Sequence, residues 1–240
     1  MTNLRRHRFQ LTSLALASTL LTAGLASGAG ASSGPTAKSV LKAAQSALAK
    51  VSGVHIEVNS KSGTVYSTVV VDIGKTSGIE SVSSGLKKIT ITVTPTFAYL
   101  SGSPAGLSTI MGLTAAQIKK VGGNSIVMAA GTTPYANFQR NLTSGVLLGM
   151  LPASKGTTLK SGTHNHKKDY VLTWTTAASG TTPITKSVLT IAGDKTSLPI
   201  KESISSASGG GTTIFSKWGE SVNPPVPNAS ATVTYKKIFG

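Results

Sequence analysis

The stretch VHIEVNSKSGTVYSTVVVDI, residues 54–73, decides the fold of this chain. In its first part Val54, Ile56 and Val58 alternate with polar residues, and this period of two is typical of a half-buried strand. After a glycine that interrupts the pattern, Val65 to Ile73 predicts a second strand. Two strands that follow each other this closely begin a meander, so we expect a largely antiparallel β protein.

Upstream of this stretch the sequence predicts a helix. Ser32-Ser33-Gly34-Pro35 offers a cap and a proline for its first turn. Apolar residues then recur at helical spacing, at Val40, Leu41, Ala44, Ala47, Leu48 and Val51. Gly53 ends the pattern, so an N-terminal helix should lead directly into the sheet.

Downstream, predicted strands surround a helical middle section. Ile89–Val93 and Phe97–Leu100 flank the turn Thr94-Pro95-Thr96 and predict a hairpin. Between Pro104 and Leu151 the apolar spacing is helical, apart from a brief strand at 125–128. The later predicted strands are Thr157–Lys160, Asp169–Thr176, Thr185–Ala192, Ile200–Ser205 and Thr212–Trp218, with Gly209-Gly210-Gly211 as a break before the last of them. A final stretch, Ala231–Ile238, also alternates like a strand.

The first residues predict export from the cytoplasm. A basic start at residues 5–8 precedes an apolar stretch, Leu11–Leu25, which is shorter than the roughly twenty residues that span a bilayer. Small residues follow as far as Ala31, so we predict a signal peptide over 1–31 and one domain over 32–240. The chain contains no cysteine to which a lipid could be attached. We therefore expect a secreted or envelope-associated protein without a lipid anchor.

The charge of the chain points to anionic surfaces. Lys and Arg number 23 against 7 acidic residues. Removal of Arg5, Arg6 and Arg8 with the signal peptide leaves 20 basic residues, of which only Arg140 is an arginine. Lysine lacks the planar fork that reads bases, and aromatic residues are few, so a nucleic-acid partner is not expected. The charge fits a solvated, soluble surface, and the functional alternative is an anionic membrane or cell-wall surface as a partner.

Several segments occur in an order that resembles a known family. After the leading helix come Phe97-Ala98-Tyr99-Leu100-Ser101-Gly102, Leu148-Gly149-Met150-Leu151-Pro152, Ser197-Leu198-Pro199-Ile200 and Phe215-Ser216-Lys217-Trp218-Gly219-Glu220. Over roughly Pro35 to Pro227 the chain resembles the actinobacterial LppX/LprG-type lipoproteins, which have a LolA-like fold. The resemblance implies an α+β fold in which a strongly curved antiparallel half-barrel sheet wraps short helices. It also implies non-enzymatic binding or transfer of a lipid or other acyl-chain ligand in an apolar cavity.

Two features depart from that family. The segment Leu21-Thr22-Ala23-Gly24 is followed by Leu25 where the family has a lipid-bearing cysteine. The tail Asn228 to Gly240 extends beyond the end of the family's sheet and adds an edge strand or covers the mouth of the cavity.

The candidate ligand-binding residues are apolar side chains of the sheet and of the middle helices. They are Val58, Val69, Ile91, Leu107, Ile110, Met111, Leu147, Leu151 and Leu189. The alternative is a fully packed core, in which methionines simply fill gaps. With such a core the protein would be a structural or adhesive envelope protein whose basic surface binds anionic polymers.

Catalytic and metal sites are not predicted. His164-Asn165-His166 offers two metal ligands where zinc sites use three or four. His55 should lie on the outer, polar face of its strand. The acidic residues, among them Glu57, Glu80, Glu202 and Glu220, stand far apart in the sequence. We expect no cofactor, and the oligomeric state stays open.

Overall fold

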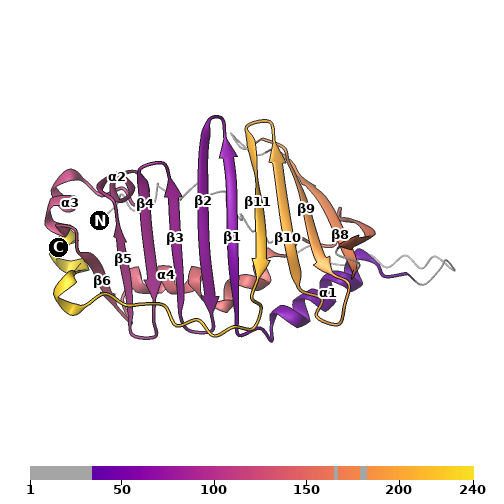
Figure 1. Cartoon of the computed structure of the whole chain (residues 1–240), viewed down its shortest axis with the longest axis horizontal. Coiled ribbons are helices and arrows are strands. Elements are labelled where there is room, and N and C mark those ends of the chain that lie inside the picture. The colour runs from indigo at the N-terminus through magenta and orange to yellow at the C-terminus, as the bar shows by residue number, and fades with distance from the viewer. Residues whose placement is uncertain (1–33, 165–166, 179–182) are drawn as a thin grey trace.

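One open sheet of 12 strands dominates the protein (Figure 1). The computed structural model describes residues 34–164, 167–178 and 183–240. In chain order the strands are β1 (Gly53–Ser62), β2 (Val65–Gly74), β3 (Gly78–Ser84), β4 (Lys87–Val93), β5 (Phe97–Gly102), β6 (Ser125–Ala129), β7 (Thr158–His164), β8 (Lys167–Thr176), β9 (Thr185–Ala192), β10 (Pro199–Ser206), β11 (Gly209–Ser216) and β12 (Thr232–Thr234). Across the sheet their order is β12-β6-β5-β4-β3-β2-β1-β11-β10-β9-β8-β7.

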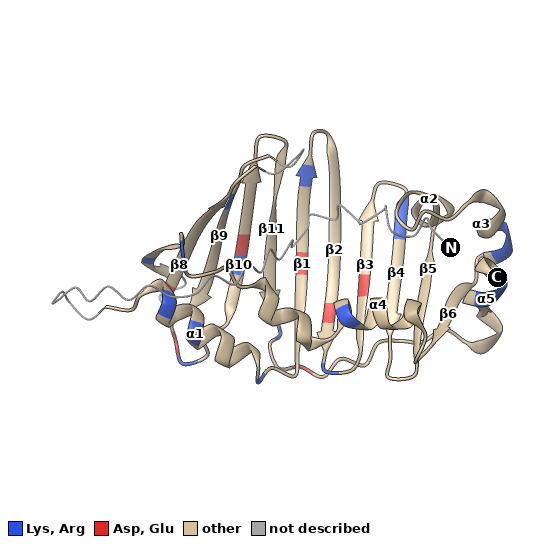
Figure 2. Ribbon diagram, turned by 180° about the vertical axis from the view of Figure 1, so that it is seen from behind, with Lys and Arg blue, Asp and Glu red and all other residues tan. Residues whose placement is uncertain are grey.

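Neighbouring strands are antiparallel except at one end of the sheet. There β12 pairs with β6 in parallel, so the sheet is mixed. The short helices are α1 (Ala37–Leu48), α2 (Pro104–Thr109), α3 (Ala115–Val121), α4 (Thr133–Leu142) and α5 (Tyr235–Phe239), with 3-10 turns η1 (Ser144–Met150) and η2 (Ala229–Ala231). Helices α1 and α4 lie on one face of the sheet (Figures 1 and 2). The predicted α+β fold, an open sheet with short helices and a helix before the first strand, is confirmed.

The two faces of the sheet follow the alternation read from β1. Val54, Ile56 and Val58 point to the side covered by helices, which we call the inner face. His55 and Glu57 point to the opposite side, the outer face. Because cross-strand partners share a face, the pairing registers show which side chains of each remaining strand lie on the inner face and which on the outer face.

The inner face is packed in two separate apolar clusters. The first joins β3, β4, β5 and β6 to α2, α3, α4 and α5. The second joins α1 and η1 to β1, β8, β9 and β11. Helix α1 begins with a capping box in which Thr36 and Ser39 exchange hydrogen bonds, and it buries Val40, Leu41, Ala44 and Leu48. The helical spacing of these buried residues predicted helix α1 correctly. The predicted cap at 32–35 was wrong, because the N-cap residue is Thr36.

The glycine run was wrongly predicted as a break between strands. Gly209, Gly210 and Gly211 form the first part of β11 and pair with both β1 and β10. A Cβ atom on Gly209 would lie 2.1 Å from the carbonyl oxygen of Lys61. Glycine is needed here because the neighbouring backbone approaches too closely for a side chain.

The C-terminal stretch 231–238 is only partly a strand, so that prediction was also wrong in part. After β12 the chain turns into α5, which Thr234 caps by accepting a hydrogen bond from the Lys237 amide. Tyr235 and Phe239 lie one helical turn apart and stack with ring centroids 4.3 Å apart. Tyr235, Ile238 and Phe239 are spaced as on one face of a helix. Val233 and Tyr235 are two residues apart, as in a strand, and this spacing led to the wrong prediction.

Strand β3 is the one described strand that the sequence did not predict. Its inner-face positions are Gly78, Glu80, Val82 and Ser84, so the apolar alternation that identifies a strand is missing. Within the described residues, no helix is both long and apolar enough to span a membrane. The boundary between a signal peptide at 1–31 and a domain at 32–240 stays a prediction, because residues 1–33 lie outside the described part of the chain.

Candidate functional site

The nine predicted cavity residues belong to the two inner-face clusters. Val69, Ile91, Leu107, Ile110 and Met111 pack in the first cluster, and Val58, Leu147, Leu151 and Leu189 pack in the second. Four of them, Ile91, Leu107, Leu147 and Leu189, are fully buried. The other five are half-buried. The structure thus divides these residues between two packed groups, and their role as walls of one cavity stays a prediction.

A continuous row of side chains connects the two clusters across the inner face. Each member is the direct cross-strand partner of the next, and the row runs Leu172, Leu189, Glu202, Thr213, Val58, Val69, Val82 and Ile89, from β8 to β4. We call it the inner row. It contains three of the nine predicted residues, and at its centre Val58 and Val69 are only half-buried. The inner row is therefore an apolar path whose middle is less covered than its ends.

Glu202 is the one ionisable residue of the inner row. It lies on β10 between Leu189 and Thr213 and is 5% exposed. Burial raises the pKa of its carboxyl to about 7. No ion pair joins it to a described lysine or arginine. At neutral pH and below, a large share of this carboxyl is uncharged, so the inner row stays close to neutral.

Glu80 occupies a similar position on β3, in the row next to the inner row. Its cross-strand partners are Val71 and Ile91, both apolar. Burial raises the pKa of this carboxyl as well. Sequence reasoning missed both glutamates as members of the inner face. The signal was present for Glu202, because Ile200, Glu202 and Ile204 share one parity of a predicted strand.

The two inner-face carboxyls do not form an acid–base pair. Strands β10 and β3 are four strand spacings apart, which at about 4.8 Å each separates Glu202 and Glu80 by roughly 19 Å. Glycoside cleavage uses carboxyl groups about 5 to 9.5 Å apart. These two groups therefore cannot act together on one bond.

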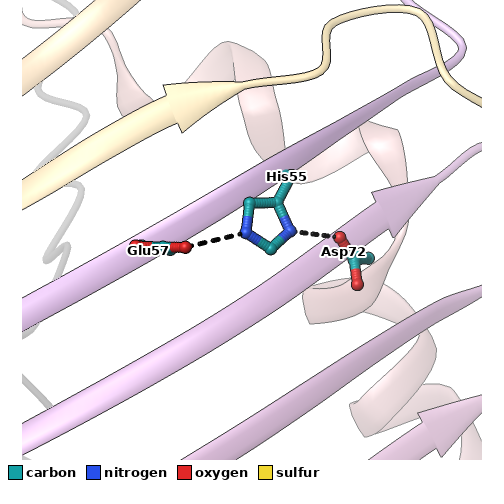
Figure 3. A network of polar contacts seen from close by, with 3 residues as sticks. All are labelled: His55, Glu57 and Asp72. Atoms are coloured by element: carbon teal, nitrogen blue, oxygen red, sulfur yellow. Dashed lines mark hydrogen bonds and ion pairs between the residues drawn. The ribbon is translucent and has the colours of Figure 1, made fainter.

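A polar network occupies the outer face (Figure 3). His55 contacts Asp72 through Nδ1 at 2.6 Å and Glu57 through Nε2 at 3.2 Å. Burial acts to lower the pKa of His55, but the hydrogen bonds to Asp72 and Glu57 and the charge of Asp72 outweigh it and raise the pKa above 6.5. A serine–histidine–aspartate triad needs a hydroxyl at the second ring nitrogen, and here a carboxylate takes that place. The prediction that His55 faces outward is consistent with this geometry, and the network holds charge on the surface.

A hollow of about 570 Å³ lies at the lower edge of the sheet, away from the inner row. It is formed by the end of α1, the loop between β9 and β10, and Trp218. The Trp218 indole donates a hydrogen bond to the Pro199 carbonyl at 2.9 Å and stacks on Phe215 at 6.0 Å. Trp218 therefore anchors the end of the sheet.

The described residues contain no group of three or more His, Asp or Glu side chains placed to hold a metal ion. The predicted weak metal candidate, His164-Asn165-His166, cannot be judged, since Asn165, His166 and the side chain of His164 lie outside the described part.

Comparison with solved structures finds chains of distantly similar fold, including the following three. The crystal structure of the lipoprotein LppX of Mycobacterium tuberculosis is 14% identical, with 78% of this chain and 97% of that chain covered and a TM-score of 0.49. LprF from Mycobacterium bovis is 13% identical, with coverage of 80% and 96% and a TM-score of 0.48. A DUF1329 family protein from Desulfovibrio piger is 9% identical, with coverage of 79% and 95% and a TM-score of 0.33.

These likenesses, at 14% identity or less, concern the fold alone. No family model matches the chain, and no curated protein sequence matches it. At these identities no functional residue is carried over, and the proposals below rest on this chain's own side chains.

Proposed function

We propose that this protein binds a lipid or another acyl-chain ligand along the inner row, without catalysing a reaction, outside the cytoplasm. The inner row is the observation that carries this proposal. It is an apolar path across eight strands, its middle is half-buried, and its one ionisable group has a pKa of about 7. An acyl chain gains about 0.8 kcal/mol for each methylene that it buries, so roughly ten methylenes suffice for useful affinity.

The arrangement of the helices supports a ligand at the middle of the inner face. Helices α1 and α4 lie along the lower part of that face (Figure 2). Val58 and Val69 lie near the middle of their strands, where Val58 packs against the second cluster and Val69 against the first. A chain lying over these two valines would join the clusters into one apolar layer. The predicted residues Ile110, Met111 and Leu151, all half-buried, would then flank the ligand.

Native mass spectrometry of the protein, purified without detergent, tests the proposal. We expect a bound species whose mass matches a lipid or fatty acid. Repeated preparations that carry no such species, and that take up no fluorescent fatty acid, would contradict it.

A matched pair of variants locates the ligand. Val69 and Val70 are both half-buried neighbours on β2, but Val69 belongs to the inner row and Val70 faces outward beside Glu57. We expect Val69→Trp to fill the path and weaken fatty-acid binding at least tenfold, and Val70→Trp to change it less than twofold. Circular dichroism checks that both variants fold. Equal binding by the two variants would remove the ligand from the inner row.

A structural or adhesive envelope role is the second candidate function. It is favoured by the close packing of both clusters, in which residues such as Leu147, Leu172 and Ile126 are fully buried. If the protein carries no lipid and moderate salt releases it from cell envelopes, this second function holds.

A further inference from the structure

The upper edge of the sheet in Figure 1 collects the most exposed apolar side chains of the described residues. Because the strands alternate in direction, the β1–β2, β3–β4 and β10–β11 turns and the beginning of β9 all lie at this edge. We call residues 62–66, 84–88, 183–186 and 206–209 the upper rim. Leu86 is 87% exposed, Tyr66 65%, Ile184 61% and Val65 55%, and every other large apolar side chain described is less exposed than these.

Positive charge surrounds these apolar tips, and negative charge is absent from them. Lys61 precedes the first turn, Lys87 and Lys88 follow Leu86, and Lys186 follows Ile184. None of the seven acidic residues lies within three positions of the four rim segments. The acids of the sheet stand in the middle or lower part of their strands (Figure 2). The rim therefore combines exposed apolar side chains with lysines, and no acidic residue lies close to it in the sequence.

Hydrogen bonds hold the turns of the rim in place. The Ser103 hydroxyl donates to the Leu86 carbonyl at 2.8 Å and accepts from the Lys88 amide at 3.1 Å. The Ser84 hydroxyl donates to the Tyr66 carbonyl at 3.2 Å, which ties the second turn to the first. Leu86 and Tyr66 thus stand on turns whose backbone is held by hydrogen bonds.

A second set of contacts extends the rim in the other direction. The Gly63 amide donates to the Ser208 carbonyl at 3.4 Å, linking the β1–β2 turn to the β10–β11 turn. The Lys61 ammonium lies 5.0 Å from the centre of the Tyr66 ring. The rim is consequently one continuous structure across the centre of the sheet.

We propose that the upper rim docks this protein on the surface of an anionic lipid bilayer. Apolar tips enter the boundary between head groups and acyl chains, while lysines remain at the level of the anionic head groups. An anionic cell-wall polymer would engage the lysines but would leave Leu86 and Tyr66 without a partner. A second copy of the chain would bring two lysine-rich rims together, which like-charge repulsion disfavours.

The position of the rim adds to the proposed lipid binding without depending on it. The inner row crosses β1, β2, β10 and β11 among its eight strands, and the turns that join these four strands belong to the rim. A bilayer held at the rim would therefore sit at the ends of the strands that carry the proposed acyl path.

Vesicle sedimentation tests the docking surface with a matched pair of double variants. Tyr66→Ser with Leu86→Ser removes two tips of the rim. Phe97→Ser with Val226→Ser removes two exposed apolar side chains, 40% and 54% exposed, from outside the rim. On vesicles of phosphatidylcholine with phosphatidylglycerol we expect the rim variant to bind at least tenfold more weakly and the control to stay within twofold of the unmodified protein. Equal losses in the two variants, or none in the rim variant, would overturn the proposal.

A second pair separates the charge of the rim from the net charge of the protein. Lys87→Gln with Lys88→Gln and Lys236→Gln with Lys237→Gln each remove two adjacent cations, the second pair from α5 at the far end of the sheet. We expect the first to weaken binding severalfold more than the second, and phosphatidylcholine alone to bind poorly. Equal effects would mean diffuse attraction and would overturn the proposal. A dimer in analytical ultracentrifugation that the Leu86→Ser change dissolves would make the partner a second copy, which also overturns it.

Native mass spectrometry of the same variants keeps the two proposals apart. The rim variant should retain its bound lipid while it loses vesicle binding. If the rim variant loses vesicle binding and keeps its lipid, the docking surface and the ligand site are separate. If the unmodified protein binds vesicles but carries no lipid, the docking proposal holds and the proposed lipid binding fails.

Discussion

The two faces of the sheet treat acidic residues in opposite ways. On the outer face Asp72 and Glu57 flank a histidine whose pKa they raise, so charge is paired and exposed to water. On the inner face Glu202 and Glu80 lie among apolar partners, and burial raises the pKa of each carboxyl. Acidic residues thus contact a histidine on the outer face, whereas on the inner face burial raises the pKa of the glutamates.

This difference shows what the inner face is suited to hold. A fixed negative charge beside an acyl chain would have to be desolvated when the ligand binds, at considerable cost. A glutamic acid that gives up its charge near neutral pH lowers that cost and still offers one hydroxyl donor to a ligand oxygen. The inner row therefore suits a ligand with a long apolar part and at most a few polar atoms.

The largest expected effect concerns the pH dependence of stability. A carboxyl whose pKa is raised on folding, from 4.5 to about 7, stabilises the folded protein fully below pH 4.5. That stability is lost as the pH rises to about 7, and at roughly 1.4 kcal/mol per pH unit the loss amounts to about 3 kcal/mol. We expect Glu202→Gln to remove this part of the pH dependence, so that urea unfolding at pH 5 and pH 8 gives more similar free energies than in the unmodified protein.

The control for this measurement is Glu220→Gln, which changes an exposed carboxyl outside the sheet. It should leave the difference between pH 5 and pH 8 as it is in the unmodified protein. A Glu202→Gln protein with an unaltered pH difference would show that the inner face does not suppress charge at this position.

A new carboxyl on either face would sharpen the comparison. Val69 and Val70 are both half-buried, and they point to the inner and outer face respectively. We expect Val69→Glu to destabilise the protein by about 2 kcal/mol at pH 8 and by less at pH 5, where the carboxyl can take up a proton. Val70→Glu should cost under about 1 kcal/mol, part of it repulsion from the cross-strand Glu57. Chemical denaturation of both variants at the two pH values provides the measurement, and equal costs at pH 8 would contradict the assignment of faces.

Much of this architecture could be predicted from the alternation in the sequence. Where apolar residues alternate over several positions, as at Val69, Val71 and Ile73 in β2 and at Leu189 and Ile191 in β9, the predicted strands agree with the structure to within one residue at each end. Strand β3 was missed because its inner face carries glycine, glutamate and serine beside a single valine. Gly209 to Gly211 could not be assigned to a strand, since their role depends on how closely Lys61 approaches from a segment far away in the sequence.

The candidate site was harder to predict than the fold. Val58, Val69, Ile91 and Leu189 lie on the inner face by the pairing registers, while their role as ligand contacts stays a prediction. The alternation in the sequence could not show that these residues divide between two clusters, because that depends on where α1, α4 and η1 pack. The His55 network was also beyond sequence reasoning, since Asp72 reaches His55 only through the register of the β1–β2 hairpin.

The smallest expected effect comes from the outer face. Asp72→Asn removes the carboxylate that lies 2.6 Å from His55, while the effect of burial on the histidine remains. We therefore expect the pKa of His55 to fall, which titration of its ring signals by NMR would measure.

A raised histidine pKa contributes stability that is complete below pH 6.5 and is lost as the pH rises through the folded pKa. Because Asp72 is more than a third exposed, water screens the pair, and the stability at stake is below about 1 kcal/mol. Glu57→Gln should lower the pKa less, since Glu57 is more exposed and its contact is longer. If Asp72→Asn left the pKa of His55 unchanged, the outer face would not pair charge in the way that its geometry indicates.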